Sequence, residues 1–196
     1  MTEEASPALA DVLREEVKYE EENYKQPEEV KSVPEPWTLK DEPGSTHVML
    51  ERKFDNEKVV VDLLIHEQDD QNEELNEQEG EDGEVDVDVD VSVSFSVSIV
   101  KNGRALVFDC TSDGSYVEIV HVSLADETAL NTEQDDEAYE GPVYQELDEK
   151  LQQAFEEMLA ERGVTPELGE YLMRLSEDKE QREYMGWLQR VADVVN

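Results

Sequence analysis

The chain has 196 residues, of which 53 are Asp or Glu and 16 are Lys or Arg, so its formal net charge is -37 at pH 7. Such a chain repels phosphate backbones, because sequence-independent nucleic-acid binding depends on Lys and Arg, so nucleic acid is expected as a partner only indirectly. Basic proteins, basic peptide segments and divalent cations are the natural partners. The hydrophobic content of 37% is low for a globular chain and favours one domain, with disordered segments or with stabilisation by oligomerisation and bound cations.

The single cysteine, Cys110, excludes an intramolecular disulfide and is typical of a reducing compartment. No apolar run is long and uncharged enough to cross a bilayer, so no transmembrane segment is expected. The first residues, MTEEASPALADVLREE, are acidic, the opposite of an Arg-rich transit peptide. We expect either that the protein is not imported or that this is a mature form with an added Met.

Residues 1–36 are expected to form an N-terminal helix followed by a linker. Ser6 and Pro7 are typical of a helix cap and first helical position. Apolar residues then recur with helical spacing, at Leu9, Val12, Leu13 and Val17. After Tyr19 the sequence is charged and is interrupted by three prolines, Pro27, Pro34 and Pro36. Proline forbids regular structure around it, so this stretch predicts a linker.

From residue 37 the apolar period changes to two, which predicts a sheet over residues 37–123. The runs HVMLERKF (47–54) and KVVVDLLIH (58–66) are separated by Asp55-Asn56-Glu57, and together they predict an antiparallel hairpin. The sheet then continues beyond an acidic loop at residues 67–84.

The longest predicted strand runs from Val85 to Lys101 and alternates strictly between apolar residues and Asp or Ser. One face of the sheet is therefore expected to be buried and the other wet. Asn102-Gly103 is the strongest hairpin signal in the chain and returns it as RALVFDC. A further turn at Ser112-Asp113-Gly114 leads into SYVEIVHVS, so the strands predict an antiparallel meander.

Helical spacing returns after Gly141-Pro142, and C-terminal helices are expected over residues 144–195. The first is predicted to end at Arg162-Gly163. A short turn then carries three leucines, Leu168, Leu172 and Leu175. Ser176 is expected to cap a separate last helix. These elements predict an α+β fold with helices over one face of an antiparallel sheet, and their surplus of apolar surface favours self-association.

The candidate binding site is the acidic tract and the start of the long strand, which carry carboxylates without a single Lys or Arg. Its members are Asp69, Asp70, Glu73, Glu74, Glu77, Glu79, Glu81, Asp82, Glu84, Asp86, Asp88 and Asp90. Asp86, Asp88 and Asp90 resemble the opening of a calcium loop. The pattern fails where an EF-hand needs Gly and Glu, since Val91 and Val97 stand there. Loose association of Ca²⁺ or Mg²⁺ with the whole tract is the alternative, and no specific metal site is predicted.

Catalytic chemistry finds little support in the sequence. Cys110 and His121 could form a nucleophile and base, but no third orienting residue or oxyanion-hole motif accompanies them, and a cysteine in an alternating strand is usually a core residue. His47 and His66 lack the spacing of zinc ligands. Neither phosphate-binding glycine motif is present, so no cofactor is expected.

Several motifs together resemble the mitochondrial glycoprotein family of acidic matrix proteins. They are Tyr139-Glu140-Gly141-Pro142, Leu147-Asp148-Glu149, Glu161-Arg162-Gly163, Tyr184 with Trp187-Leu188, and Leu106, Phe108 and Cys110 in RALVFDC. The resemblance covers the chain from Trp37 to its end. The acidic loop and the VDVDVDV run depart from it, and no binding residue carries over.

This resemblance implies a seven-stranded antiparallel sheet flanked by terminal helices, assembled as a doughnut-shaped homotrimer in the mitochondrial matrix. It also implies a non-enzymatic role linked to oxidative phosphorylation, mitochondrial translation and ribosome assembly. We therefore expect an acidic binding protein or chaperone that masks basic clients. The alternatives are a low-affinity Ca²⁺ buffer and an enzyme that acts through Cys110.

Overall fold

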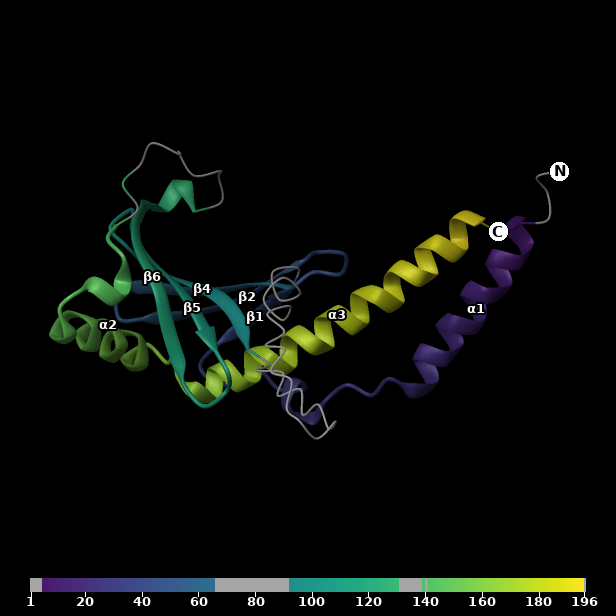
Figure 1. Cartoon of the computed structure of the whole chain (residues 1–196), viewed down its shortest axis with the longest axis horizontal. Coiled ribbons are helices and arrows are strands. Elements are labelled where there is room, and N and C mark those ends of the chain that lie inside the picture. Colours follow the sequence, from purple (N-terminus) through teal and green to yellow (C-terminus); the bar gives the residue numbers. More distant parts are fainter. Residues whose placement is uncertain (1–4, 66–91, 131–138, 140, 196) are drawn as a thin grey trace, which may run out of the picture.

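The computed structural model describes residues 5–65, 92–130, 139 and 141–195. In this part of the chain one antiparallel sheet of six strands, in the order β1-β2-β3-β4-β5-β6, is flanked by three α-helices (Figure 1). The strands are β1 (Thr38–Asp41), β2 (His47–Phe54), β3 (Glu57–Leu64), β4 (Val93–Lys101), β5 (Arg104–Ser112) and β6 (Val117–Asp126). The α-helices are α1 (Ala5–Asn23), α2 (Glu149–Glu161) and α3 (Pro166–Val195). The predicted α+β class is confirmed.

Two-residue turns join the strands where the sequence predicts hairpins. Asp55 and Asn56 connect β2 to β3, and Asp55 has φ 49°. Asn102 and Gly103 connect β4 to β5, with φ 53° and 77°. Asn, Asp and Gly adopt positive φ at the lowest cost, which is why these dipeptides close hairpins whose strands twist the right way. Each strand thus pairs with the next along the chain.

The predicted alternation is confirmed where it can be observed, from Val93 onward. Val93, Phe95, Val97 and Ile99 are buried, while the serines between them are half-buried on the other face. The strand begins at Val93, and the predicted residues 85–91 lie outside the described part of the chain. The buried face packs under α2 and α3, where Phe108 of β5 meets Phe155 of α2 edge to face at 5.7 Å. Apolar burial on this face is the main favourable term in folding.

The C-terminal region contains one helix where two segments were predicted. α3 runs unbroken through Ser176, so the predicted helix start at that residue is wrong. The leucine stripe of its first half is continued by Asp178 and Lys179, which are buried against the edge of the sheet, and then by Leu188 and Ala192. Ser and Gly cost a helix interior less than about 1 kcal/mol each, so these tertiary contacts outweigh the local capping signal.

The second half of α3 leaves the sheet and pairs with α1 to form a projecting helical arm (Figure 1). Leu13 of α1 packs there against Leu188 and Ala192 of α3. α1 begins at Ala5, so Ser6 lies inside the helix and not at its cap as predicted. We use the name helical arm for α1 together with residues 181–195. The domain boundary predicted between residues 36 and 37 stays a prediction.

Other boundaries differ modestly from expectation. β1 was not singled out by the sequence, since it has only four residues. β6 continues to Asp126, three residues beyond the predicted end of the sheet, and a short 3-10 helix, Glu28–Val30, interrupts the linker. Within the described ranges, no helix has the length and apolar character needed to cross a membrane. The sheet has six strands in the same ranges, and a seventh stays an expectation.

Candidate functional site

The twelve predicted binding carboxylates, from Asp69 to Asp90, lie outside the described residues, so their geometry stays untested. Their point of attachment is nevertheless fixed. β3 ends at Leu64 and β4 begins at Val93, so the acidic tract joins the sheet at the end where these two strand termini meet. We call this the acidic end. Because β1 and β2 are antiparallel, Asp41 and His47 lie at the same end.

A buried ion network fastens α3 to the acidic end. Lys179 is completely buried, and its Nζ lies 2.7 Å from Asp41 Oδ1 and 2.6 Å from Glu183 Oε1. The same Nζ donates to the Glu42 carbonyl oxygen at 2.8 Å. Hydrogen bonds to Glu183 and to the Glu42 carbonyl oxygen, together with the ion pair to Asp41, compensate the buried ammonium group, which is how a lysine can be buried in its charged form.

Arg182 completes this network one turn along α3. Its Nη2 lies 2.7 Å from Asp41 Oδ2 and its Nε 2.8 Å from Asp178 Oδ2. Tyr24, in the linker, donates its hydroxyl proton to Asp178. Burial by itself would raise the pKa of Asp41, but hydrogen bonds from Lys179 and Arg182 outweigh it and hold that pKa below its usual value. Lys179 and Arg182 at the acidic end are thus already paired with carboxylates inside the fold.

The opposite end of the sheet has the reverse arrangement. Here the β2–β3 and β4–β5 turns lie side by side, and we call this the cationic end. Glu51 lies between Lys40 at 2.8 Å and Lys58 at 2.9 Å. Glu57 lies between Lys101 at 3.1 Å and Arg162 at 2.8 Å. The carboxylates are the more buried partners, so lysines form the outer surface.

These pairings set the carboxyl pKa values in the same direction. The hydrogen bond from Arg162 is the largest influence on Glu57 and lowers its pKa. Burial opposes ionisation of Glu51, yet hydrogen bonds from Lys40 and Lys58 leave its pKa lowered. Both carboxylates stay charged at neutral pH and hold their lysines in place.

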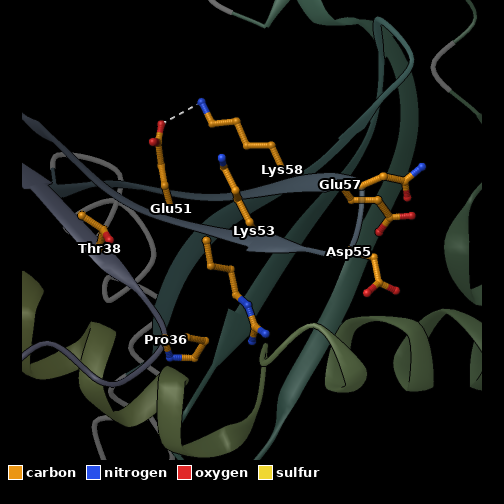
Figure 2. A pocket seen from close by; sticks show the side chains of 9 residues that line it. Pro36, Thr38, Glu51, Lys53, Asp55, Glu57 and Lys58 are labelled. Atoms are coloured by element: carbon orange, nitrogen blue, oxygen red, sulfur yellow. Dashed lines mark ion pairs between the residues drawn. The ribbon is translucent and has the colours of Figure 1, made fainter.

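A pocket of about 620 Å³ opens at the cationic end beside the β2–β3 hairpin (Figure 2). Its lining residues come from the start of β1 and from the hairpin, namely Pro36, Thr38, Glu51, Arg52, Lys53, Asp55, Asn56, Glu57 and Lys58. Glu51, Lys53 and Lys58 project to the same side of the hairpin in Figure 2. Lys53 and Lys58 are directly opposite each other in the register, and within the described ranges Lys53 makes no ion pair. Like charges in that position repel each other.

Behind the pocket, two arginines and two aromatic rings form a column. The Arg52 guanidinium lies 5.5 Å from the Trp37 ring centre and 5.6 Å from that of Phe54, and the Arg162 guanidinium lies 4.8 Å from the Phe54 ring centre. Arg52 also donates from Nη1 to the Arg162 carbonyl oxygen at 2.8 Å. A Cβ on Gly163 would lie 2.3 Å from this nitrogen, so the Arg162-Gly163 motif needs glycine for space as well as for its φ of 84°.

Other motif residues also have structural roles. Gly141 has φ 112°, and a Cβ there would lie 2.7 Å from the Val122 carbonyl oxygen. Asp148 caps α2 by accepting from the backbone N–H of Lys150 at 3.0 Å. Tyr184 and Trp187 stack on the helical arm with ring centres 6.3 Å apart. The quoted motifs therefore specify turns, caps and packing.

The Cys110–His121 hypothesis is wrong on geometry. Cys110 points to the core, where it is 2% exposed, and burial raises the pKa of its thiol to about 12. His121 is paired in register with Asp109, the neighbour of Cys110, so it lies on the other face of the sheet. His121 therefore does not serve as a base for this thiol, and the raised pKa disfavours the thiolate form that a nucleophile requires.

His47, the other histidine in the described part of the chain, belongs to no metal centre there. His47 Nδ1 lies 3.1 Å from Asp62 Oδ1 at the acidic end, and His66 is outside the described residues. Nowhere in the described ranges do three or more His, Cys, Asp or Glu side chains gather closely enough to hold a metal ion.

Sequence reasoning missed both ion clusters. The local signals were the segment ERKFDNEK, residues 51–58, which alternates charges around a turn, and the i,i+4 pairs Asp178–Arg182 and Lys179–Glu183. Neither signal points to the partner on another element. The partners Lys101 and Arg162 are 44 and 105 positions from Glu57, and Lys179 is far from Asp41 along the chain. No spacing rule connects residues that meet only after the sheet and helices have packed.

Comparison with known proteins gives this architecture a family. The family model described as mitochondrial glycoprotein matches residues 13–195. The Schizosaccharomyces pombe protein named Mitochondrial acidic protein mam33 is 28% identical over 93% of this chain and 76% of its own length. An uncharacterised mitochondrial protein of Arabidopsis thaliana is also 28% identical, over 82% of this chain and 62% of its own length. The chain therefore spans less than two thirds of that second relative.

Two solved structures have the same fold over nearly their full length. The Trypanosoma brucei p22 protein superposes with a TM-score of 0.75 at 23% identity, covering 98% of this chain and 99% of that one. A Leishmania major protein described as a sequence homologue of human p32 gives 0.76 at 26% identity with the same coverage. The relatives named by location are mitochondrial, and this chain is assigned to the mitochondrion with them. The chain belongs to the mitochondrial glycoprotein family.

Proposed function

We propose that this chain is a non-enzymatic binding protein of the mitochondrial matrix that captures basic proteins by charge attraction. In this role it would act as a chaperone for Lys/Arg-rich clients and so support mitochondrial translation, ribosome assembly and oxidative phosphorylation. The capturing surface is the carboxylate tract from Asp69 to Asp90 at the acidic end.

The proposal rests on the ion pairs that the Lys and Arg residues of the chain make. Carboxylates of the described region already form ion pairs with ten of the 16 Lys and Arg residues. The tract itself brings no Lys or Arg, and Lys179 and Arg182 beside its attachment point are already bound to Asp41, Asp178 and Glu183. Neither of these two cations is therefore left to neutralise the tract, which favours the capture of an external cation. Such attraction favours fast, salt-sensitive capture over shape-specific recognition.

We propose further that the protein works as the doughnut-shaped homotrimer of seven-stranded subunits that the family resemblance implies. The helical arm supports self-association, because it keeps a second apolar strip. Leu9, Val12 and Tyr19 of α1 are at least 46% exposed, as are Trp187 and Val194 of α3. On each helix, this exposed set lies about a quarter turn around the helix axis from the side that packs against the other helix. The direction of that rotation places both sets on the same side of the antiparallel pair. Burying this strip between copies would also concentrate the charge of several chains in one particle.

Binding of a fluorescent Lys/Arg-rich peptide, titrated at increasing salt, tests the capture mechanism. The expected affinity falls steeply between low and moderate salt. A variant with the twelve tract carboxylates changed to amides should lose far more affinity than a matched control with twelve exposed carboxylates changed on α1, α2 and α3. Equal losses in the two variants, or an affinity independent of salt, would exclude the tract as the capturing surface.

Light scattering of the intact chain tests the assembly. A mass three times that of the 22.4 kDa chain supports the trimer. Trp187→Ser should lower that mass while circular dichroism stays unchanged, and a monomeric wild-type chain would contradict the proposed assembly.

A Ca²⁺-buffering role is the second candidate, and the Asp86, Asp88 and Asp90 alternation favours it. Hard cations prefer carboxylate oxygens, and a row of them would bind loosely. Calorimetry at physiological salt should then give heat beyond that of a polyglutamate of equal charge. Heat equal to that of the polymer would reject the role.

A further inference from the structure

We propose that the pocket at the cationic end is a binding site for an extended acidic peptide segment, which adds to the sheet edge beside residues 52–54. This partner is opposite in charge to the clients of the acidic tract, so the site is a second function and does not rest on the first. We call this site the edge notch.

The edge of the sheet has a step beside residues 52–54, where β1 begins. β1 pairs with β2 only from Val48 to Glu51, because β1 begins at Thr38. Immediately before it, the Trp37 N–H donates to the Pro34 carbonyl oxygen at 2.9 Å in a turn that leads the chain away. Among the residues that the structure describes, no strand therefore pairs with residues 52–54 of β2 on the side of β1. This step in the edge coincides with the pocket in Figure 2.

The backbone N–H and C=O of Lys53 are oriented toward this step. A two-residue turn joins Phe54 to Glu57, so this pair exchanges the hydrogen bonds that close the hairpin. The next pair, Lys53 and Lys58, is then non-hydrogen-bonded, and the N–H and C=O of Lys53 point away from β3. They face the step, where an added strand would pair with them, as in other complexes formed by strand addition.

The side-chain charges at the notch favour an acidic ligand. Lys58 of the notch is 49% exposed, and Lys40, which lies outside the pocket lining on the other side of Glu51, is 52% exposed, while Glu51 between them is 20% exposed. Lys53 lies on the same side and is opposite Lys58, with Cβ atoms close because such pairs approach more tightly. Glu51 and Asp55 cannot neutralise three ammonium groups, and Glu57, the third carboxylate of the pocket lining, is already paired with Lys101 and Arg162. A carboxylate from outside would relieve the Lys53–Lys58 repulsion.

The size of the pocket suits a short extended peptide. About 620 Å³ is within the range of ligand pockets and holds a few side chains of a peptide. Successive side chains of an extended peptide alternate, so carboxylates at every second position would all face the lysines. The expected ligand is therefore a strand-forming peptide with alternating Glu or Asp.

Fluorescence anisotropy of a labelled decapeptide with alternating Glu and Thr, titrated with the intact chain at physiological salt, tests the site. We expect saturable binding that an alternating Gln and Thr peptide does not show. Lys53→Glu with Lys58→Glu should weaken binding at least tenfold. The matched control, Lys25→Glu with Lys150→Glu, changes the net charge equally at exposed positions remote from the notch and should weaken it less than threefold.

A second peptide separates strand addition from simple charge attraction. N-methylation of alternate residues keeps the charge but removes backbone donors, and should also abolish binding. Equal weakening in the two double variants, binding that survives N-methylation, or no saturable binding to wild type would each overturn the proposal. Light scattering of both variants should give the wild-type mass, and a mass change confined to Lys53→Glu with Lys58→Glu would instead assign the notch to contact with a second copy.

Discussion

The two ends of the sheet contain the same side-chain types, but the charge that is buried at one end is exposed at the other. At the acidic end, Lys179 is fully buried and carboxylates surround it, with Asp41 15% and Glu183 18% exposed. At the cationic end, Glu57 is 9% exposed and Glu51 20%, while the lysines around them are close to half exposed. The layer that faces water decides the sign of the surface, so a chain with a net charge of -37 still presents one cationic corner.

Removal of the buried cation should have the largest effect. Lys179→Met leaves Asp41 paired only with Arg182 and leaves Glu183 with the Gly44 N–H, and we expect the free energy of unfolding to fall by about 3 kcal/mol. Urea denaturation followed by circular dichroism measures it. Arg174→Met is the control, since its pair with Glu177 is exposed and is expected to contribute under about 0.5 kcal/mol. A similar cost for both would show that the buried network does not stabilise the acidic end.

At the cationic end, Gly163→Ala should rank second, at about 2–3 kcal/mol, because its Cβ would collide with Arg52 and its φ is positive. Gly103→Ala is a matched control: its φ is 77°, but nothing lies within 4 Å of the added carbon, so only the backbone cost of about 1–2 kcal/mol remains. The difference between the two thermal midpoints isolates the collision. Equal midpoints would mean that the Arg52 column yields freely.

The pH dependence of one pair should have a smaller effect. The pKa of Glu57 is lowered in the fold, so its stabilisation is complete above the unfolded value of about 4.3 and is lost as pH falls through the folded pKa. Glu57→Gln should therefore cost about 1–2 kcal/mol at pH 7, and this cost should shrink as the pH falls below about 4.3. Urea midpoints of wild type and variant across this range provide the test. A gap that stays constant with pH would refute the assignment.

The smallest change is expected at the edge notch. Lys53→Met removes a charge that opposes Lys58 without breaking an ion pair of the described region, so stability should stay equal or rise by about 0.5 kcal/mol at most. Lys58→Met, which loses the contact with Glu51 at 2.9 Å, should destabilise by a similar amount. Differential scanning calorimetry at low salt would resolve the two signs. The same sign for both would argue against like-charge repulsion at the notch.

Much of the fold could be predicted from local patterns. The hairpins at Asp55-Asn56 and Asn102-Gly103, the face of the strand from Val93 to Ile99 and the helix that ends at Arg162-Gly163 are where the sequence predicts them. By contrast, the predicted helix start at Ser176 is wrong, because burial of Asp178 and Lys179 continues the helix through it. The predicted binding carboxylates from Asp69 to Asp90 stay a prediction.

By itself, the sequence determined the turns, the alternation, the acidic excess and the family. Each depends on neighbouring residues, on composition or on motifs that lie within a few positions of one another, and such information needs no packing to be read. Only the tertiary structure decided which charges face water. Lys179 meets Asp41, and Glu57 meets Arg162, across more than a hundred residues, so the fold alone made one end of this sheet acidic and the other cationic.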